Sequence, residues 1–321
     1  MNIIDFGDCR ETMRRWASEG IKAQTCVTSP PYYGLRDYGN DGQIGLEETP
    51  EEYIAAMVEV FRCVRDVLAD DGTVWLNIGD SYYNYRPGKG QALVKQTVAN
   101  SDQDLPQTCA RRGNKLEGLK EKDLIGIPWM LAFALRADGW YLRQDIIWHK
   151  PNPMPESVQD RCTKAHEYIF LLSKSQKYYF DSEAIREKGE MTAEDSAGST
   201  QRDTRETHGV GGGNSGINKA KQKLAEELAT LGYSTRNKRS VWTVQTKPFK
   251  GAHFATFPQE LIEPCILAGA PVGGIVLDPF MGSGTTAQVA QNLGRQYIGC
   301  ELNTDYKPLQ DKRVAQQALV L

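Results

Sequence analysis

Paired cysteines are missing from this sequence, because its seven cysteines are scattered along the chain and no CxxC pair occurs. Their spacing excludes a disulfide framework and a cysteine-based zinc site. We also expect no signal peptide, since Asp5 and Asp8 interrupt the N-terminal segment before an apolar core of sufficient length could form. We therefore expect a protein of the reducing cytoplasm that holds no metal.

The sequence also lacks a strong excess of charge or of hydrophobic residues. Charged residues make up 25% and hydrophobic residues 40% of its 321 positions, which is ordinary for a globular protein and indicates neither a fibre nor a membrane protein. The net charge is −3, but residues 201–250 hold ten Lys and Arg against four Asp and Glu. That stretch therefore carries +6 and leaves −9 for the rest of the chain, so it is the segment best suited to bind a polyanion.

Strand-like and helix-like segments alternate along the chain, which is long enough for one large α/β domain or two smaller ones. We predict strands at residues 2–5, 23–28, 73–78, 141–148, 167–172, 274–277 and 296–300. We predict helices at residues 10–18, 50–68, 124–137, 259–268, 285–293 and 306–319. This alternation predicts a mostly parallel sheet with helices on both faces.

Two long polar stretches, residues 82–122 and 183–239, interrupt the alternation. Both are too long to be ordinary connections between elements. Functional loops, an inserted subdomain and disorder are all compatible with their composition. The plain alternative is a solvated, charged linker in each case.

A nucleoside-binding pattern lies near the C-terminus, in "GGIVLDPFMGSGTTAQVAQNLGRQYIGCEL". An apolar strand ends at Asp278, a glycine turn and a helix follow, and the next strand ends at Glu301. Glycines allow close backbone approach to a ligand, and an acidic residue after the second strand binds ribose hydroxyls.

Three ligands could use this pattern. A P-loop nucleotide needs a lysine for its phosphates, and "GSGTT" has none. A dinucleotide remains open, because residues 282–287 fit G-x-G-x-x-A. The carboxylate of Asp278 would repel a pyrophosphate but attract a cationic amino group, which favours S-adenosylmethionine.

The stretch "TSPPYYG" at residues 28–34 follows a predicted strand directly. Two prolines fix two φ angles and remove two N–H donors, so the backbone is stiff and its carbonyls are left to face another group. The plain interpretation is a rigid turn with half-buried tyrosines. The functional interpretation is a grip on a substrate.

These two motifs resemble those of the amino-directed DNA methyltransferases. Asp278-Pro279-Phe280-x-Gly282-x-Gly284-Thr285-Thr286 is similar to the family's cofactor motif, and Ser29-Pro30-Pro31-Tyr32 to its catalytic motif, (Asp/Asn/Ser)-Pro-Pro-(Tyr/Phe/Trp). A catalytic motif that precedes the cofactor motif is typical of the permuted β class. The resemblance covers nearly the whole chain, including "FGDC" and "HFATFPQELIEPCI".

The resemblance implies a Rossmann-like methyltransferase fold, with a mixed, mostly parallel seven-stranded sheet and an inserted target-recognition region. We expect a catalytic part at 1–182 with an inserted loop at 82–122. We expect the target-recognition region at 183–250 and the cofactor-binding part at 251–321.

The residue types fit the chemistry of this family. An exocyclic amino nitrogen is a poor nucleophile, and acceptors aimed at its N–H groups free its lone pair for attack. We expect Ser29, Pro30, Pro31 and Tyr32 to be catalytic, with the Ser29 hydroxyl and the Pro30 carbonyl as acceptors. Tyr32 would stack on a base that is flipped out of the duplex.

Further site residues follow from the same resemblance and, for DNA, from the basic residues of the two polar stretches. We expect S-adenosylmethionine to contact Asp8, Cys9, Phe257, Asp278, Phe280, Gly282, Ser283, Gly284, Thr285 and Glu301. We expect DNA phosphates to contact Arg86, Lys89, Arg111, Arg112, Lys219, Lys221 and Lys223.

Ser29 also indicates the substrate, because serine at this position of the family goes mostly with cytosine-N4 methylation. Adenine-N6 methylation is the alternative, and a NAD-dependent oxidoreductase or a catalytically silent DNA-binding protein is a more distant one. We expect double-stranded DNA and no membrane as partner. The recognition sequence, a cognate restriction endonuclease and the choice between monomer and homodimer stay open at this point.

Overall fold

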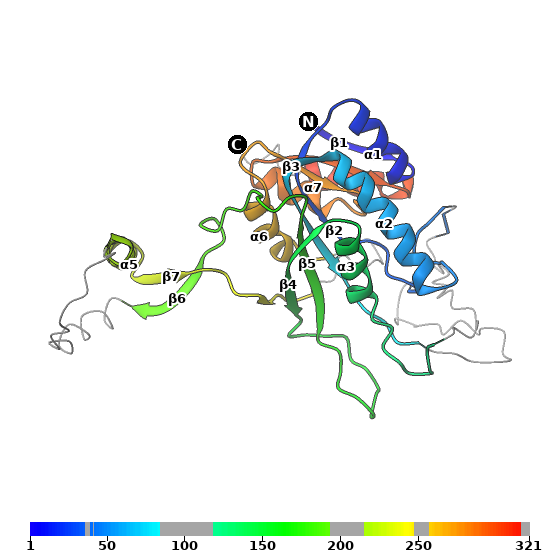
Figure 1. Ribbon diagram of the computed structural model, residues 1–321, viewed down its shortest axis with the longest axis horizontal. Coiled ribbons are helices and arrows are strands. Elements are labelled where there is room, and N and C mark those ends of the chain that lie inside the picture. Colours follow the sequence, from blue (N-terminus) through cyan, green and yellow to red (C-terminus); the bar gives the residue numbers. More distant parts are fainter. Residues whose placement is uncertain (36–38, 41, 84–117, 193–214, 247–256, 316–321) are drawn as a thin grey trace. The chain divides into compact units, whose positions relative to one another are not determined.

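The protein is described by a computed structural model that covers residues 1–35, 39–40, 42–83, 118–192, 215–246 and 257–315 (Figure 1). The chain divides into two compact units. The larger unit is formed by Met1–Asp181 together with Ser240–Leu321, and the smaller by Ser182–Arg239. Within the described segments, no helix is long and apolar enough to cross a lipid bilayer.

The larger unit is built on one eight-stranded sheet with the order β1-β10-β9-β2-β3-β5-β4-β8. Five of its neighbouring pairs are parallel, and β5 runs antiparallel to both β3 and β4. The strands are β1 (Asn2–Phe6), β2 (Ala23–Thr28), β3 (Leu68–Ile78), β4 (Tyr141–His149), β5 (His166–Ser173), β8 (Val241–Thr243), β9 (Ile275–Asp278) and β10 (Gln296–Glu301).

Helices cover both faces of this sheet because its central strands are apolar on both sides. Three helices pack on one another along one face: α1 (Cys9–Ser18), α2 (Pro50–Val67) and α3 (Ile127–Ala137). Their core includes Cys26, Leu76 and Phe170. On the other face α6 (Gln259–Gly269) packs on α7 (Thr285–Asn292), which contacts α8 (Lys307–Ala315). Gly269 of α6 lies against Thr25 and Trp75, which alternate with the first set along their strands.

The structure confirms the predicted fold class and places all seven predicted strands in the sheet. The short β8 is an eighth strand, which the sequence pattern did not indicate. Helix α3 begins at Ile127, later than the predicted start at Leu124, because Gly126 adopts a left-handed conformation with φ 87°. Leu124 instead pairs with Tyr82 in an isolated β-bridge.

The smaller unit contains elements that were not predicted. They are β6 (Glu187–Thr192), the helix α5 (Ser215–Leu231) and β7 (Tyr233–Arg236), and β6 pairs with β7 in an antiparallel ladder. The unit is nearly neutral, because residues 182–239 hold ten Lys and Arg against nine Asp and Glu. The charge of +6 over residues 201–250 thus depends on where the window begins.

Candidate active site

Several of the predicted catalytic and cofactor-binding residues lie at one edge of the sheet. Strands β1, β10, β9, β2 and β3 are parallel to one another, so their carboxyl ends meet at this edge. Ser29 follows the end of β2, while Asp278 and Glu301 end β9 and β10. In open α/β sheets, ligands bind outside the carboxyl ends of the strands where the strand order reverses. The catalytic and cofactor motifs meet at such a point, between β2 and β9.

Asp278 connects the two motifs through hydrogen bonds to its buried carboxylate. Its Oδ1 accepts from the Thr28 hydroxyl at 2.6 Å and from the Phe280 N–H at 3.0 Å, and its Oδ2 accepts from the Thr286 hydroxyl at 2.6 Å. Asp278 is 1% exposed, and burial raises the pKa of its carboxyl to about 6. Both oxygens thus accept hydrogen bonds from the protein. A direct contact of Asp278 with the cofactor stays a prediction.

The glycine turn between β9 and α7 has the shape of a ligand cradle. Gly282 and Gly284 take φ angles of 53° and 86°, which L-residues with side chains rarely adopt. A Cβ at Gly282 would have only the Phe280 carbonyl oxygen within 4 Å, at 3.9 Å, so the space beside it is open. The buried Ser283 hydroxyl has no hydrogen-bond partner among the described residues. An unpaired hydroxyl beside the open space at Gly282 fits a polar ligand such as S-adenosylmethionine.

Glu301 closes the other side of this cradle. Its Oε2 accepts from the Gly282 N–H at 2.6 Å, and its Oε1 accepts from the Asn303 N–H at 2.8 Å. Burial raises the pKa of the Glu301 carboxyl, while the backbone donors oppose that shift. Each carboxylate oxygen has capacity for a further donor, so Glu301 is suited to bind ribose hydroxyls.

Helix α8 supports the cradle, which sequence reasoning did not foresee. The Gln310 side-chain amide donates to the Gly282 carbonyl at 2.7 Å, and the Arg313 guanidinium donates to the Thr285 hydroxyl. Gln310 and Arg313 are 2% and 8% exposed, so both are interior residues of an otherwise polar helix. Their burial depends on packing against the glycine turn, so no local pattern in α8 marks these two residues.

The segment after β1 holds two further residues that were predicted to contact the cofactor, Asp8 and Cys9. Asp8 caps α1 and forms an ion pair with Arg10 at 2.5 Å. This ion pair lowers the pKa of the Asp8 carboxyl. Cys9 is 7% exposed and belongs to the core, so its thiol is turned inward. Phe257 and Phe280 are both half-buried. The structure brings Phe280 to the glycine turn, and the cofactor contacts of Asp8, Cys9 and Phe257 stay predictions.

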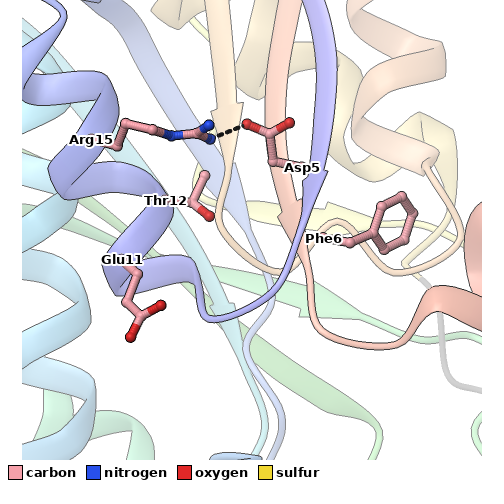
Figure 2. Close-up of a pocket in the computed structure, with 5 residues that line it drawn as sticks. All are labelled: Asp5, Phe6, Glu11, Thr12 and Arg15. Carbon is pink, nitrogen blue, oxygen red and sulfur yellow. Dashed lines mark hydrogen bonds and ion pairs between the residues drawn. The ribbon is translucent and has the colours of Figure 1, made fainter.

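A small pocket lies between β1 and α1 (Figure 2). Asp5, Phe6, Glu11, Thr12 and Arg15 line it, and Arg15 pairs with Asp5 at 2.5 Å. None of these residues was predicted for the site. One of them, Phe6, is paired with Glu301 in the β1–β10 ladder.

The catalytic motif is fixed by side chains from a helix and a strand. The Tyr53 hydroxyl of α2 donates to the Pro31 carbonyl at 2.9 Å. The Pro30 carbonyl has no donor among the residues described, so it stays able to accept a substrate N–H. Tyr32 is half-buried, and its hydroxyl donates to Glu167 of β5 at 2.7 Å.

The predicted DNA contacts are only partly covered. Arg86, Lys89, Arg111 and Arg112 lie outside the described residues, and of Lys219 and Lys221 only the backbone in α5 is described. Lys223 pairs with Glu183 at 2.6 Å. The DNA-binding roles of these residues stay predictions.

The sheet order, the glycine turn and the acidic end of β10 define a methyltransferase fold of the S-adenosylmethionine-dependent class. Two solved structures share the fold at low identity. The first is the PvuII DNA methyltransferase (cytosine-N4-specific), with a TM-score of 0.59 and 17% identity over 97% of this chain and 86% of that one. The second is TTHA0409 from Thermus thermophilus in complex with S-adenosyl-L-methionine, with a TM-score of 0.57 and 22% identity over 100% of this chain and 96% of that one.

The chain belongs to the DNA methylase family of N6/N4 amino methyltransferases, whose model matches residues 23–312. It is 48% identical to the type II methyltransferase M.Cfr9I of Citrobacter freundii, over 94% of this chain and 83% of the relative. It is 45% identical to the type II methyltransferase M.SmaI of Serratia marcescens, over 97% and 90%. The protein is thus a DNA methyltransferase that uses S-adenosylmethionine, and the oxidoreductase alternative falls away.

Proposed function

We propose that the protein methylates cytosine N4 at a specific DNA sequence, as the modification enzyme of a type II restriction-modification system. The observation that carries the proposal is the position of Ser29, which directly follows the last residue of β2, Thr28. The Thr28 hydroxyl is hydrogen-bonded to Asp278, the residue before the cofactor turn. M.Cfr9I and M.SmaI are both named type II methyltransferases, which supports the inclusion of a cognate endonuclease. The enzyme would act on DNA in the cytoplasm.

The side chains of the motif supply what the reaction needs from the protein. The Ser29 hydroxyl and the Pro30 carbonyl accept the two N–H bonds of the cytosine amino group and draw its nitrogen toward a pyramidal geometry. S-adenosylmethionine, held by the glycine turn and Glu301, supplies the electrophilic methyl group. The proton leaves after transfer, so the motif needs no strong general base. Tyr32 replaces the stacking that the flipped cytosine loses, at roughly 1–3 kcal/mol per base.

The smaller unit, residues 182–239, is assigned in this proposal to target recognition. It is the compact insertion between the strands that carry the catalytic edge and the helix that leads to the cofactor turn. Its net charge of only +1 suits base-edge readout better than bulk attraction to phosphates. Residues 1–181 and 240–321 would then supply catalysis and cofactor binding.

One measurement tests the base and the sequence together. DNA from cells that express the protein would be digested to nucleosides for mass spectrometry, and the modified positions would be mapped by sequencing. N4-methylcytosine at one recurrent sequence is the expected result. N6-methyladenine would overturn the choice of base but keep the enzyme class, and cells that express Tyr32→Ala provide the background.

A further inference from the structure

A group of polar side chains that the motifs do not include meets the Tyr32 hydroxyl. That hydroxyl donates to Glu167 Oε2 at 2.7 Å and lies 3.4 Å from Asn77 Oδ1. The Lys150 ammonium donates to the other carboxylate oxygen, Oε1. Glu167 and Lys150 are 15% and 18% exposed, so this ion pair is largely removed from water.

The sheet register explains why these residues meet. Glu167 is the second residue of β5, where it pairs with Trp148 of β4, and Lys150 directly follows β4. On the other side β5 pairs with β3, and Ile78 lies opposite Tyr168. Because β3 and β4 are antiparallel to β5, their carboxyl ends and the start of β5 lie at the same edge as Ser29.

The ring of Tyr32 lies against Gly79, a residue that has no side chain. A Cβ at Gly79 would lie 2.5 Å from Tyr32 Cε2 and 3.1 Å from Cδ2, closer than van der Waals contact allows. Gly79 follows β3 directly. The ring is therefore fixed at two points, by contact with Gly79 at its edge and by the hydrogen bond to Glu167 at its hydroxyl.

We propose that Glu167, paired with Lys150, is a positioning residue for methyl transfer, and that it holds the Tyr32 ring in the orientation that receives the flipped base. The inference rests on the proposed base-stacking role of Tyr32. A ring that is already fixed does not lose rotational freedom when the base arrives. Less of the stacking energy is then needed to offset the entropy cost of ordering the ring. Without its partner, the hydroxyl of a half-buried tyrosine would turn toward another acceptor and take the ring with it.

Charge and burial keep this contact in one form. Burial and the Glu167 charge hold the pKa of the Tyr32 hydroxyl well above its usual range, so the hydroxyl remains a donor. Lys150 occupies Oε1 and lies 4.2 Å from the centre of the Trp148 ring, which fixes the carboxylate from its far side. Glu167 thus offers Oε2 to Tyr32 and not to solvent.

The competing role for a carboxylate at this edge is to accept the proton that leaves the amino group. Variants distinguish the two roles, because a positioning residue acts only through Tyr32. Tyr32→Phe keeps the ring and removes the hydroxyl. Glu167→Gln keeps the shape, but its amide has one acceptor oxygen, which Lys150 takes, so its NH2 group faces the Tyr32 hydroxyl.

The experiment measures single-turnover methyl transfer from labelled S-adenosylmethionine to DNA of a host that lacks the enzyme. Each single variant should lower the rate about ten- to hundredfold, the range for loss of a hydrogen bond to a charged group. The double variant should be no slower than the slower single variant. Tyr33→Phe is the matched control, because the neighbouring Tyr33 hydroxyl donates to the Glu48 carbonyl and not to Glu167.

Three outcomes would overturn the proposal. Losses that multiply in the double variant would give Glu167 a role apart from Tyr32, such as proton acceptance. A wild-type rate for Tyr32→Phe would remove the hydroxyl contact from function. A loss of cofactor affinity as large as the loss of rate, measured by calorimetry, would mean that the variants disturb the structure of the whole site. Tyr32→Ala separates these from the proposed function, because a wild-type rate in that variant would contradict base stacking itself.

Discussion

The Thr28 hydroxyl donates a 2.6 Å hydrogen bond to Asp278, two residues that are 250 positions apart in the chain. Thr28 is the last residue of the strand that carries Ser29, and Asp278 is the last residue before the cofactor turn. Asp278 also accepts from Thr286 at the start of α7. One buried carboxylate therefore holds both the catalytic motif and the cofactor turn, so in the proposed site we expect the distance between methyl donor and acceptor base to be insensitive to motion of either loop alone.

The first prediction concerns the pH dependence of stability at Asp278. Its pKa in the folded state is about 6, above the ordinary value of 3.8 because of burial. The folded state then binds more protons than the unfolded state between these values, so the free energy of unfolding falls as the pH rises from about 4 to 6. A shift of this size corresponds to about 3 kcal/mol of stability present at low pH and lost above pH 6.

Asp278→Asn removes this titration. The difference in unfolding free energy between the wild type and the variant should therefore favour the wild type more at pH 4 than at pH 7, by up to about 3 kcal/mol. Denaturant titrations across that range measure it. Asp70→Asn, at a side chain that is 99% exposed, controls for the loss of one charge. A difference that does not vary with pH would contradict the buried, ionisable Asp278.

The second prediction concerns Glu301 and the cofactor. Glu301→Ala removes the acceptor of the Gly282 N–H as well as the expected ribose contact. S-adenosylmethionine binding should weaken by about 1.5–3 kcal/mol, the range for hydrogen bonds to a charged group. Isothermal titration calorimetry measures this directly. Unchanged affinity would take Glu301 out of the cofactor site.

The third prediction concerns the seat of the Tyr32 ring. Gly79→Ala places a methyl group where the ring lies, so the ring must shift. Methyl transfer should fall toward the level of Tyr32→Ala, with cofactor affinity nearly intact, because the proposed site places the base against the ring and the cofactor at the glycine turn. Adding Gly79→Ala to Tyr32→Ala should have little further effect. Additional loss in that double variant would mean that Gly79 acts by other means.

The fourth prediction concerns α8, which supports the cofactor turn. Gln310→Ala removes the donor to the Gly282 carbonyl, a hydrogen bond worth about 1 kcal/mol net. S-adenosylmethionine affinity should fall about fivefold, while the thermal midpoint changes by a few degrees. Lys312→Ala, one exposed position on the same helix, is the matched control. Equal affinities for the two variants would exclude support of the turn by Gln310.

The parts of the site that the sequence predicted are those with local signatures. The strand before Ser29, the glycine turn and the acidic end of β10 each show a chemistry within a few residues, and the structure brings them to one edge. Gln310 and Glu167 had no such signature, because their roles depend on register and packing between distant segments. An isolated helix or strand pattern shows which residues are buried but not which loop or ring they meet.

Charge was harder to interpret from the sequence for a similar reason. The window at residues 201–250 excluded Glu183, Glu187 and Glu190, which lie earlier in the chain. In the fold these three pair with Lys223, Arg236 and Arg239. Sequence windows miss such pairing because β6 and β7 meet only after the chain has turned back through α5.

The last prediction concerns the salt dependence of DNA binding by α5. Log affinity for duplex DNA falls with log salt by about 0.9 for each phosphate that is neutralised. If Lys219 and Lys221 contact phosphates, changing both to Gln should lower the slope by up to about two units and weaken binding to all sequences alike. Lys223→Gln should add less than about one unit by the same rule, because Lys223 already pairs with Glu183. Titrations at several salt concentrations measure the slope, and the single Lys223 variant is the internal control. An unaltered slope in the double variant would contradict a phosphate-binding role for α5. Any contact of residues 182–239 with DNA would then be one that releases no counterions.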